Sequence, residues 1–167
     1  MISGGGFNVV IGNPPYVVYS KDKCSYELLR SEYTTIDTKN LYAFVFERSL
    51  SIANKRAPVG LIVQLTVLSS ERLPSLQNLL LGRGDTYAAP FPRRPESIFD
   101  GVEMPVAIVI SAPGGGDHFA TSWVARFYTE ERPDAIFRLP FIRHNVRRVG
   151  TGKAHLREAP DKAAGHA

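Results

Sequence analysis

Short runs of apolar residues alternate with a helical stripe along the first two thirds of the chain. Residues 7–11, 59–65 and 106–110 are almost continuously apolar or β-branched, and the last two runs are typical of strands that helices cover on both faces. Residues 41–53 carry apolar side chains at spacings of three and four, which predicts a helix. This alternation of strands and helices predicts an α/β fold.

A second helix is expected over residues 69–81, where leucines recur and Pro74 can occupy the first turn. Gly82 and Gly84 are expected to end it. Residues 85–95 contain three prolines, and we predict that they form an exposed functional loop. Farther along the chain we expect a strand over residues 121–127, a short helix over residues 130–137 and disorder beyond about residue 147.

The 167 residues are 44% apolar and 22% charged, as in an ordinary globular domain. The apolar runs are about five residues long, far short of the roughly 20 that cross a bilayer, and the first residues do not resemble a signal peptide. We therefore expect no membrane partner and a cytoplasmic location. Cys24 is the only cysteine and the four histidines show no metal-ligand spacing, so we expect neither an internal disulfide nor a metal site.

Positive charge gathers at the end of the chain. The whole sequence has 20 basic and 16 acidic residues, but seven basic and only two acidic residues follow residue 137. A basic segment of this kind is typical either of a protein that binds a polyanion or of a solvated tail, and charge alone does not separate the two. We divide the chain into a catalytic body over residues 1–142 and a basic, disordered tail over residues 143–167.

The candidate chemistry lies in Asn13, Pro14, Pro15 and Tyr16, which follow the first predicted strand. Open α/β sheets bind ligands at such strand ends, although a rigid turn is the simpler interpretation. Two successive prolines remove two amide donors and leave a stiff corner that presents acceptors. The Asn13 amide oxygen and the Pro14 carbonyl could hold one exocyclic amino group, and Tyr16 offers a flat face to a planar ring.

Several segments together resemble the adenine-N6 DNA methyltransferases of restriction-modification systems, in the class with an Asn-Pro-Pro-Tyr motif. The similarity extends roughly over residues 4–142, and Asn8 stands where that family usually has aspartate. The matching segments are residues 5–17, 41–50, 59–63, 94–95 and 98–102. The resemblance implies a partial Rossmann-like methyltransferase fold, the later half of the sheet with an antiparallel hairpin strand.

The resemblance also implies roles for individual residues. Asn13, Pro14, Pro15 and Tyr16 would form the catalytic motif, with Asn13 and Pro14 holding the amino group of a flipped-out adenine. Tyr16 and Phe99 would stack on the two faces of the base. Arg93 and Arg94 would contact DNA phosphates, although a solvated loop is an equally good interpretation.

The family takes its methyl group from S-adenosylmethionine, through a glycine-rich loop and an acidic residue that both precede the motif. Only twelve residues precede Asn13, so we expect the first strands and most of the cofactor site to be missing, with Asn13 alone retained. The chain is then expected to be inactive alone, and to be marginally stable, to self-associate or to pair with a separate polypeptide that supplies the other half. The alternatives are a protein-glutamine or RNA amino-methyltransferase, or a noncatalytic nucleic-acid-binding remnant.

Overall fold

The computed structural model describes residues 5–20, 32–70, 72–94, 97–99, 103–114, 118–122, 139–145, 148–149 and 153–154. Its elements are β1 (Val10–Gly12), the 3-10 helix η1 (Ile36–Thr38), α1 (Leu41–Ile52), β2 (Val59–Gln64), α2 (Thr66–Ser69), α3 (Pro74–Arg83), β3 (Gly84–Phe91), β4 (Val106–Pro113), β5 (His118–Ser122), β6 (Phe141–Asn145), β7 (Arg148–Val149) and β8 (Lys153–Ala154). Within these described segments, no helix is long and apolar enough to cross a membrane.

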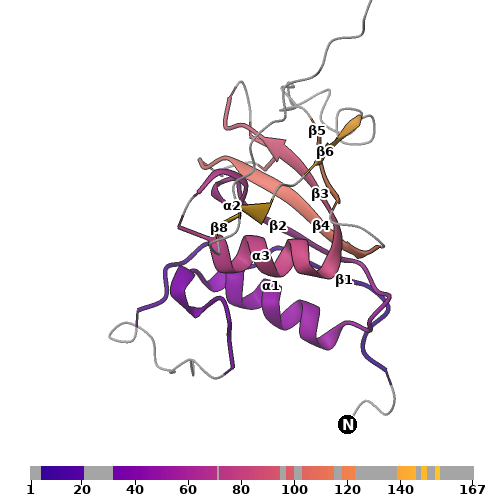
Figure 1. The fold of residues 1–167 in the computed structure, drawn as a ribbon. Coiled ribbons are helices and arrows are strands. Elements are labelled where there is room, and N and C mark those ends of the chain that lie inside the picture. Colours follow the sequence, from indigo (N-terminus) through magenta and orange to yellow (C-terminus); the bar gives the residue numbers. More distant parts are fainter. Residues whose placement is uncertain are drawn as a thin grey trace, which may run out of the picture.

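A six-stranded sheet in the order β1-β2-β4-β3-β5-β6 forms the centre of the protein (Figure 1). β1 is parallel to β2 and β3 is parallel to β5, whereas β4 runs antiparallel between β2 and β3, and β6 runs antiparallel to β5. The carboxyl ends of β1, β2, β3 and β5 therefore share one end of the sheet. We call it the carboxyl end. The α/β fold with an inserted antiparallel strand agrees with the prediction.

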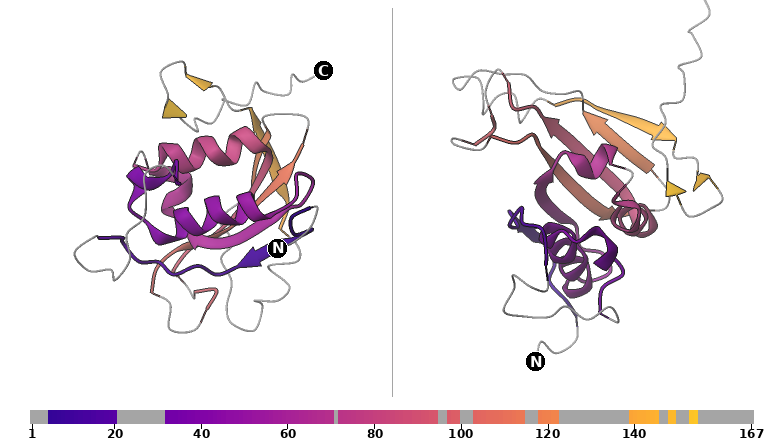
Figure 2. Two further views of the ribbon diagram at one scale, coloured as in Figure 1. Left: turned by 90° about the horizontal axis from the view of Figure 1, so that it is seen from below. Right: turned by 90° about the vertical axis from the view of Figure 1, so that its left-hand side faces the viewer.

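One face of the sheet is packed against helices. α1 and α3 lie side by side against it (Figures 1 and 2). Val59, Leu61 and Val63 alternate along β2 toward this side, where they meet Tyr42 and Phe46, one helical turn apart on α1. All five side chains are at most 2% exposed, so this main core lies between the helices and what we call the covered face.

The opposite face, which we call the open face, carries the alternate residues of the same strands. Register places Ile11, Gly60, Ile110 and Tyr87 in one row across β1, β2, β4 and β3. Ile11 is 80% exposed and Ile110 is 37% exposed. The helices of the described part of the chain pack on the covered face, so this apolar row has no helical layer over it there.

A second, smaller core covers the open face only at its carboxyl end. It consists of Ala89, Phe91, Ile98 and Val106. Ile98 comes from the connection between β3 and β4, whereas the other three residues belong to those strands. This connection therefore folds back over the sheet at the end where the motif lies.

The helix predicted over residues 41–53 and the strands predicted over residues 59–65 and 106–110 are confirmed as α1, β2 and β4. The helix predicted over residues 69–81 starts later, at Pro74, because Ser70 is extended at the end of α2 and separates two helices. Gly82 lies within α3 rather than ending it. Gly84 does end the helix, with a φ of 140° that an L side chain rarely adopts.

The exposed loop predicted over residues 85–95 is wrong for most of its length. β3 extends to Phe91, and its side chains are largely buried between β4 and β5. The prolines misled the prediction, since a proline cannot donate to a central ladder. In the part of the chain that the structure describes, β5 pairs with residues 86–88 only, and Pro90 has β4 as its described neighbour.

The strand predicted over residues 7–11 is shifted toward the motif, since β1 begins at Val10 and Phe7 makes only an isolated bridge to Ala53. Among the described residues, β1 pairs with β2 on one side and forms an edge of the sheet. Val9 is 57% exposed along this edge. The edge therefore combines unpaired backbone groups with uncovered apolar side chains.

The later predictions are only partly within the described residues. The strand predicted over residues 121–127 is present up to Ser122, as the end of β5, and its remainder lies outside the described residues. The helix predicted over residues 130–137 and Cys24 also lie outside the described residues. The boundary drawn after residue 142 falls inside β6, because backbone pairing with β5 continues through Asn145. Residues 148–149 also pair with residues 153–154. The division into body and disordered tail otherwise stays a prediction.

Candidate functional site

The motif of Asn13, Pro14, Pro15 and Tyr16 directly follows β1 at the carboxyl end of the sheet. Because β1 is parallel to β2, the motif lies beside the end of β2, the place where open α/β sheets bind ligands. Pro14 is buried, whereas Asn13 and Pro15 are exposed. The two prolines have no backbone N–H, so the backbone of the corner at these positions offers carbonyl acceptors only.

The Tyr16 side chain ties this corner to β2. Its hydroxyl donates to Asn13 Oδ1 at 2.8 Å, and the backbone oxygen of Ile62 lies 3.2 Å from the same hydroxyl. An amide oxygen has two lone pairs, so Asn13 Oδ1 can accept a second hydrogen bond from a ligand. Burial raises the pKa of Tyr16, which keeps its hydroxyl protonated and donating at neutral pH.

The Tyr16 ring rests against a buried aromatic residue of α1. Its centroid lies 6.4 Å from that of Tyr42, and the two rings are almost perpendicular, at 80°. Tyr42 is fully buried in the main core, so it gives the Tyr16 ring a fixed support. An edge-to-face pair of this kind is favourable because the positive edge of one ring meets the negative face of the other.

Phe99 lies in the connection between β3 and β4 and is partly buried. It packs against the second core, and so does Tyr16. The Ser97 hydroxyl donates to the backbone oxygen of Phe99 and holds the turn at this point. The structure therefore brings the two proposed stacking residues, far apart in sequence, to one cluster at the carboxyl end.

The segment after the motif is anchored to the start of α1. The Tyr19 amide donates to Lys39 O at 2.7 Å and the Leu41 amide donates to Val17 O at 3.0 Å. The Tyr19 ring also packs edge-to-face on Phe44 of α1, at 5.9 Å between centroids. These contacts fix the direction in which the chain leaves Tyr16.

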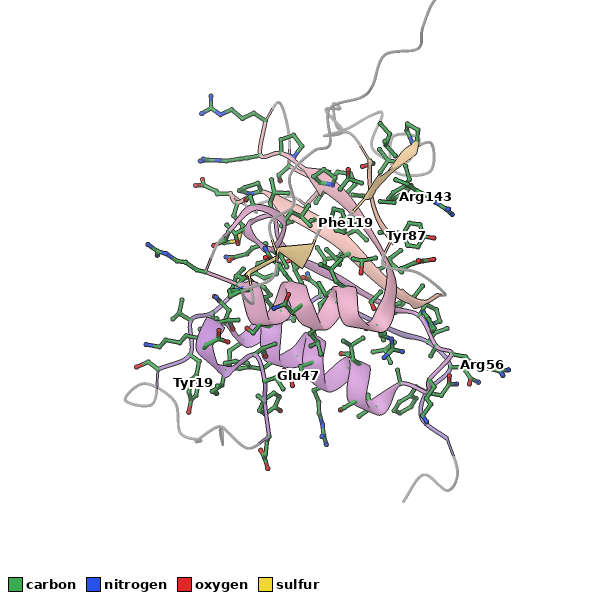
Figure 3. All side chains as sticks on the ribbon, viewed as in Figure 1. Tyr19, Glu47, Arg56, Tyr87, Phe119 and Arg143 are labelled. Atoms are coloured by element: carbon green, nitrogen blue, oxygen red, sulfur yellow. The ribbon has the colours of Figure 1, made fainter. Side chains whose placement is uncertain are left out.

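Glu47 of α1 fixes the loop that leads into η1 (Figure 3). Its Oε1 accepts from the amide and hydroxyl of Thr34 at 2.8 and 2.9 Å, and its Oε2 accepts from the amide and hydroxyl of Thr35 at 3.0 and 2.7 Å. Burial raises the pKa of Glu47, but these four hydrogen bonds to the ionised carboxylate outweigh it, so the net pKa is lowered. The carboxylate is thus a structural clamp.

The two arginines proposed for DNA contact lie just after β3 and are exposed. Arg93 Nη2 forms an ion pair with Glu103 Oε2 at 3.2 Å, with side chains 49% and 82% exposed. Such a surface pair contributes at most about 1 kcal/mol, so it does not prevent Arg93 from turning to a phosphate. The pair spans the two ends of the connection that carries Phe99.

Gln64 is a site residue that the sequence analysis missed. It ends β2 beside the motif, and its Nε2 donates to Met104 Sδ at 3.4 Å. The available signal was a single polar side chain at the carboxyl end of an otherwise apolar strand. In the described segments, no group of three or more histidine, cysteine or acidic residues could hold a metal ion.

A family model described as Eco57I restriction-modification methylase matches residues 2–85, half of the chain. The chain belongs to this family. The matched region contains the motif, α1, β2 and α3, the elements that position the corner and its support. No curated protein matches the Eco57I-type chain.

Solved structures resemble this family member in fold. The DrdV–DNA complex matches with a TM-score of 0.65 and 13% identity, over 87% of this chain and 18% of that one. A second match is a nuclease-deletion mutant of the Type ISP restriction-modification enzyme LlaGI, in complex with a DNA substrate mimic. Its TM-score is 0.65 and its sequence identity is 15%, over 88% of this chain and 18% of that one.

A modification subunit of a putative type I restriction enzyme from Vibrio vulnificus YJ016 matches with a TM-score of 0.58 and 11% sequence identity, over 88% of this chain and 36% of that one. The chain thus spans between 18% and 36% of the length of these three proteins. At such identities the likeness concerns the fold. The Rossmann-like methyltransferase fold predicted from the sequence is confirmed.

Proposed function

We propose that the chain forms the base-binding part of an adenine-N6-specific DNA methyltransferase. The observation that carries this proposal is the acceptor corner of Asn13 and Pro14 beside an aromatic cluster that includes Tyr16 and Phe99. Membership of a restriction-modification methylase family supports methyl transfer as the reaction. The substrate and the target atom are inferred from the chemistry of the corner.

An aromatic amino group is a poor nucleophile, because its lone pair is delocalised into the ring. Asn13 Oδ1 and the Pro14 carbonyl would each accept one of its hydrogens and favour a pyramidal nitrogen whose lone pair points away from the ring. Catalysis of this kind depends on positioning and electrostatics. The nitrogen loses a proton to water after the new N–C bond has formed, so the corner needs no strong general base.

The described residues fit one wall of a cofactor site. Asn13 is exposed at the end of an edge strand, so it can face both a base on the β2 side and a cofactor on the free side of β1. S-adenosylmethionine, when bound there, would supply the electrophilic methyl group. The other residues that hold it would come from a polypeptide segment placed beyond the free edge of β1.

That missing segment would complete the sheet as well as the cofactor site. The exposed side chains of Val9 and Ile11 flank a backbone edge that can accept another strand. A separate or preceding polypeptide that pairs here would bury both. We therefore expect the chain to be inactive alone.

DNA is the proposed substrate, since the fold is shared with DrdV and LlaGI, which were solved with DNA or a DNA mimic. The target adenine must leave the duplex to reach the corner, at a cost of a few kcal/mol. Stacking between Tyr16 and Phe99 would offset this cost by roughly 1 to 3 kcal/mol per aromatic contact. Arg93 and Arg94 would hold the flanking phosphates.

The test joins the chain to the amino-terminal half of a family member and measures transfer of labelled methyl groups to DNA, with nucleoside analysis of the product. We expect N6-methyladenine, and we expect Asn13→Ala to lower the rate on the order of 100-fold or more, as removal of one oriented polar group does in other sites. Asn78→Ala, an exposed amide on α3, is the matched control and should leave the rate unchanged.

Three outcomes would contradict the proposal. Methylated cytosine as the product would place a different base in the corner. Methylation of protein glutamine or RNA in place of DNA would favour the alternative amino-methyltransferases. DNA binding without methylation of any substrate, unaffected by Asn13→Ala, would favour a noncatalytic remnant.

A further inference from the structure

The amide of Gln64 occupies an unusual position for a strand residue. It is the only polar side chain of β2, and it stands at the carboxyl end of that strand, opposite Val106 of β4. Alternation along the strand places it on the open face with Gly60 and Ile62. There it is half-buried rather than solvated.

Gln64 lies past the end of β1, where the motif runs. The last residue of β1, Gly12, pairs with Leu61, so the rest of β2 extends beyond its neighbour. The Tyr16 hydroxyl reaches into this extension, 3.2 Å from the backbone oxygen of Ile62. Gln64 is two residues farther along the same strand and on the same face.

The partner of Gln64 also belongs to the aromatic cluster. Its Nε2 donates to Met104 Sδ at 3.4 Å. Met104 packs against the second core together with Tyr16 and Phe99. The amide is therefore linked through Met104 to the second core, against which Tyr16 and Phe99 also pack.

A thioether is a weak acceptor, so the bond to Met104 is readily exchanged for a stronger one. Among the described residues, the structure shows no donor paired with Gln64 Oε1. The Gln64 side chain thus offers the donor Nε2, held by a weak hydrogen bond, and its own acceptor Oε1 beside it. Both lie in a partly buried apolar setting. Such a group gains much from a polar ligand that reaches it.

We infer that Gln64 contributes to binding of the base, by donating a hydrogen bond from Nε2 to a ring nitrogen of the adenine whose amino group Asn13 and Pro14 hold. The inference rests on the proposed function. Adenine has an acceptor nitrogen on each side of its amino group, N1 on one edge and N7 on the other. Guanine has a carbonyl in place of the amino group, so it would face the acceptor corner with an acceptor.

The experiment measures fluorescence anisotropy of oligothymidylate strands of about 11 nucleotides binding to the full chain, a length within the range of single-strand-binding surfaces. One strand contains a single central adenine, and matched strands carry 1-deazaadenine, 7-deazaadenine or thymine at that position. The quantity of interest is the adenine preference, the ratio of the dissociation constants of the thymine and adenine strands.

Gln64→Met is the main variant, because it keeps the length of the side chain and removes the donor. We expect it to lower the adenine preference about 5-fold, the effect of one net hydrogen bond, without changing affinity for the thymine strand. One of the two deaza substitutions should lower the adenine preference of wild type by the same factor. The same substitution should not lower the preference of Gln64→Met any further, because the variant and the deaza base each remove the same hydrogen bond. Gln64→Glu lacks the donor and adds a negative charge, so it should lower the adenine preference at least as much and should also weaken binding of the thymine strand, and Asn78→Ala should match wild type.

The inference is overturned if Gln64→Met keeps the full preference, or if its effect adds to that of both deaza bases. These results differ from a failure of the proposed function. If wild type shows no adenine preference and Asn13→Ala changes nothing, the corner does not bind adenine and both ideas fall. If Asn13→Ala removes the preference while Gln64→Met retains it, only the role of Gln64 is lost.

Discussion

The two faces of the sheet differ sharply in how they are covered. On the covered face, Leu61 is 2% exposed beneath α1 and α3, while on the open face Ile11, at the register position next to Gly60, is 80% exposed. Both are large aliphatic residues on neighbouring strands. Among the described residues, the covered face therefore forms a packed core, whereas the open face is covered only at its carboxyl end.

The contrast explains where the candidate site lies. The connection between β3 and β4 covers the carboxyl end of the open face and carries Phe99 there. Tyr16 contacts both the main core and this second core, so it lies where the two faces meet. The candidate site thus lies at the boundary between the main core and the second core.

The largest expected difference between the faces is in stability. We expect Leu61→Ala to lower the free energy of unfolding by about 3 kcal/mol, since it leaves a cavity in the main core. Ile11→Ala should lower it by less than about 0.5 kcal/mol, because the side chain is already in water. Urea unfolding of both variants under one set of conditions measures the difference. Equal losses would mean that the open face is covered in solution.

A second, smaller effect concerns a cation that holds the helices of the covered face together. Arg83 at the end of α3 donates to the backbone oxygens of Leu50, Asn54 and Ala57 at 3.2, 3.2 and 2.7 Å. Arg83→Met keeps the aliphatic stem but leaves these acceptors without a donor, which should cost about 2 kcal/mol. Arg72→Met, at an exposed arginine just before α3, is the control and should change stability little.

The smallest expected effect depends on pH. The pKa of Glu47 is lowered in the folded protein, so its contribution to stability is complete above about pH 4.5, the ordinary value, and is lost as pH falls through the folded pKa. Because the carboxylate is largely solvated, we expect Glu47→Gln to cost less than about 1 kcal/mol at pH 7. The difference from wild type should vanish near pH 3 in denaturant titrations. If Glu47→Gln is still less stable than wild type near pH 3, the loss comes from packing rather than from the carboxylate charge. Glu103→Gln controls for loss of one surface charge.

Sequence patterns predicted the elements that local periodicity dictates. The stripe that includes Tyr42 and Phe46 marked α1 nearly to the residue, and the nearly continuous apolar run of β2 marked a buried strand. The same reasoning failed at Pro90. It treats a proline as a break in a strand, whereas Pro90 pairs with Ala107 of β4 and lies beyond the described pairing with β5. Gln64 was missed because its significance depends on Met104, which is distant in sequence.

By itself the sequence determined the α/β class and the place of the motif Asn13–Tyr16 directly after a strand, because these follow from local backbone preferences and from adjacent residues. Only the tertiary structure decided that β3 is a central strand, that Tyr16 and Phe99 join one cluster, and that Gln64 stands beside them. Such contacts join residues far apart along the chain. They arise from strand pairing and from burial of apolar surface, which depend on the whole fold rather than on any one segment.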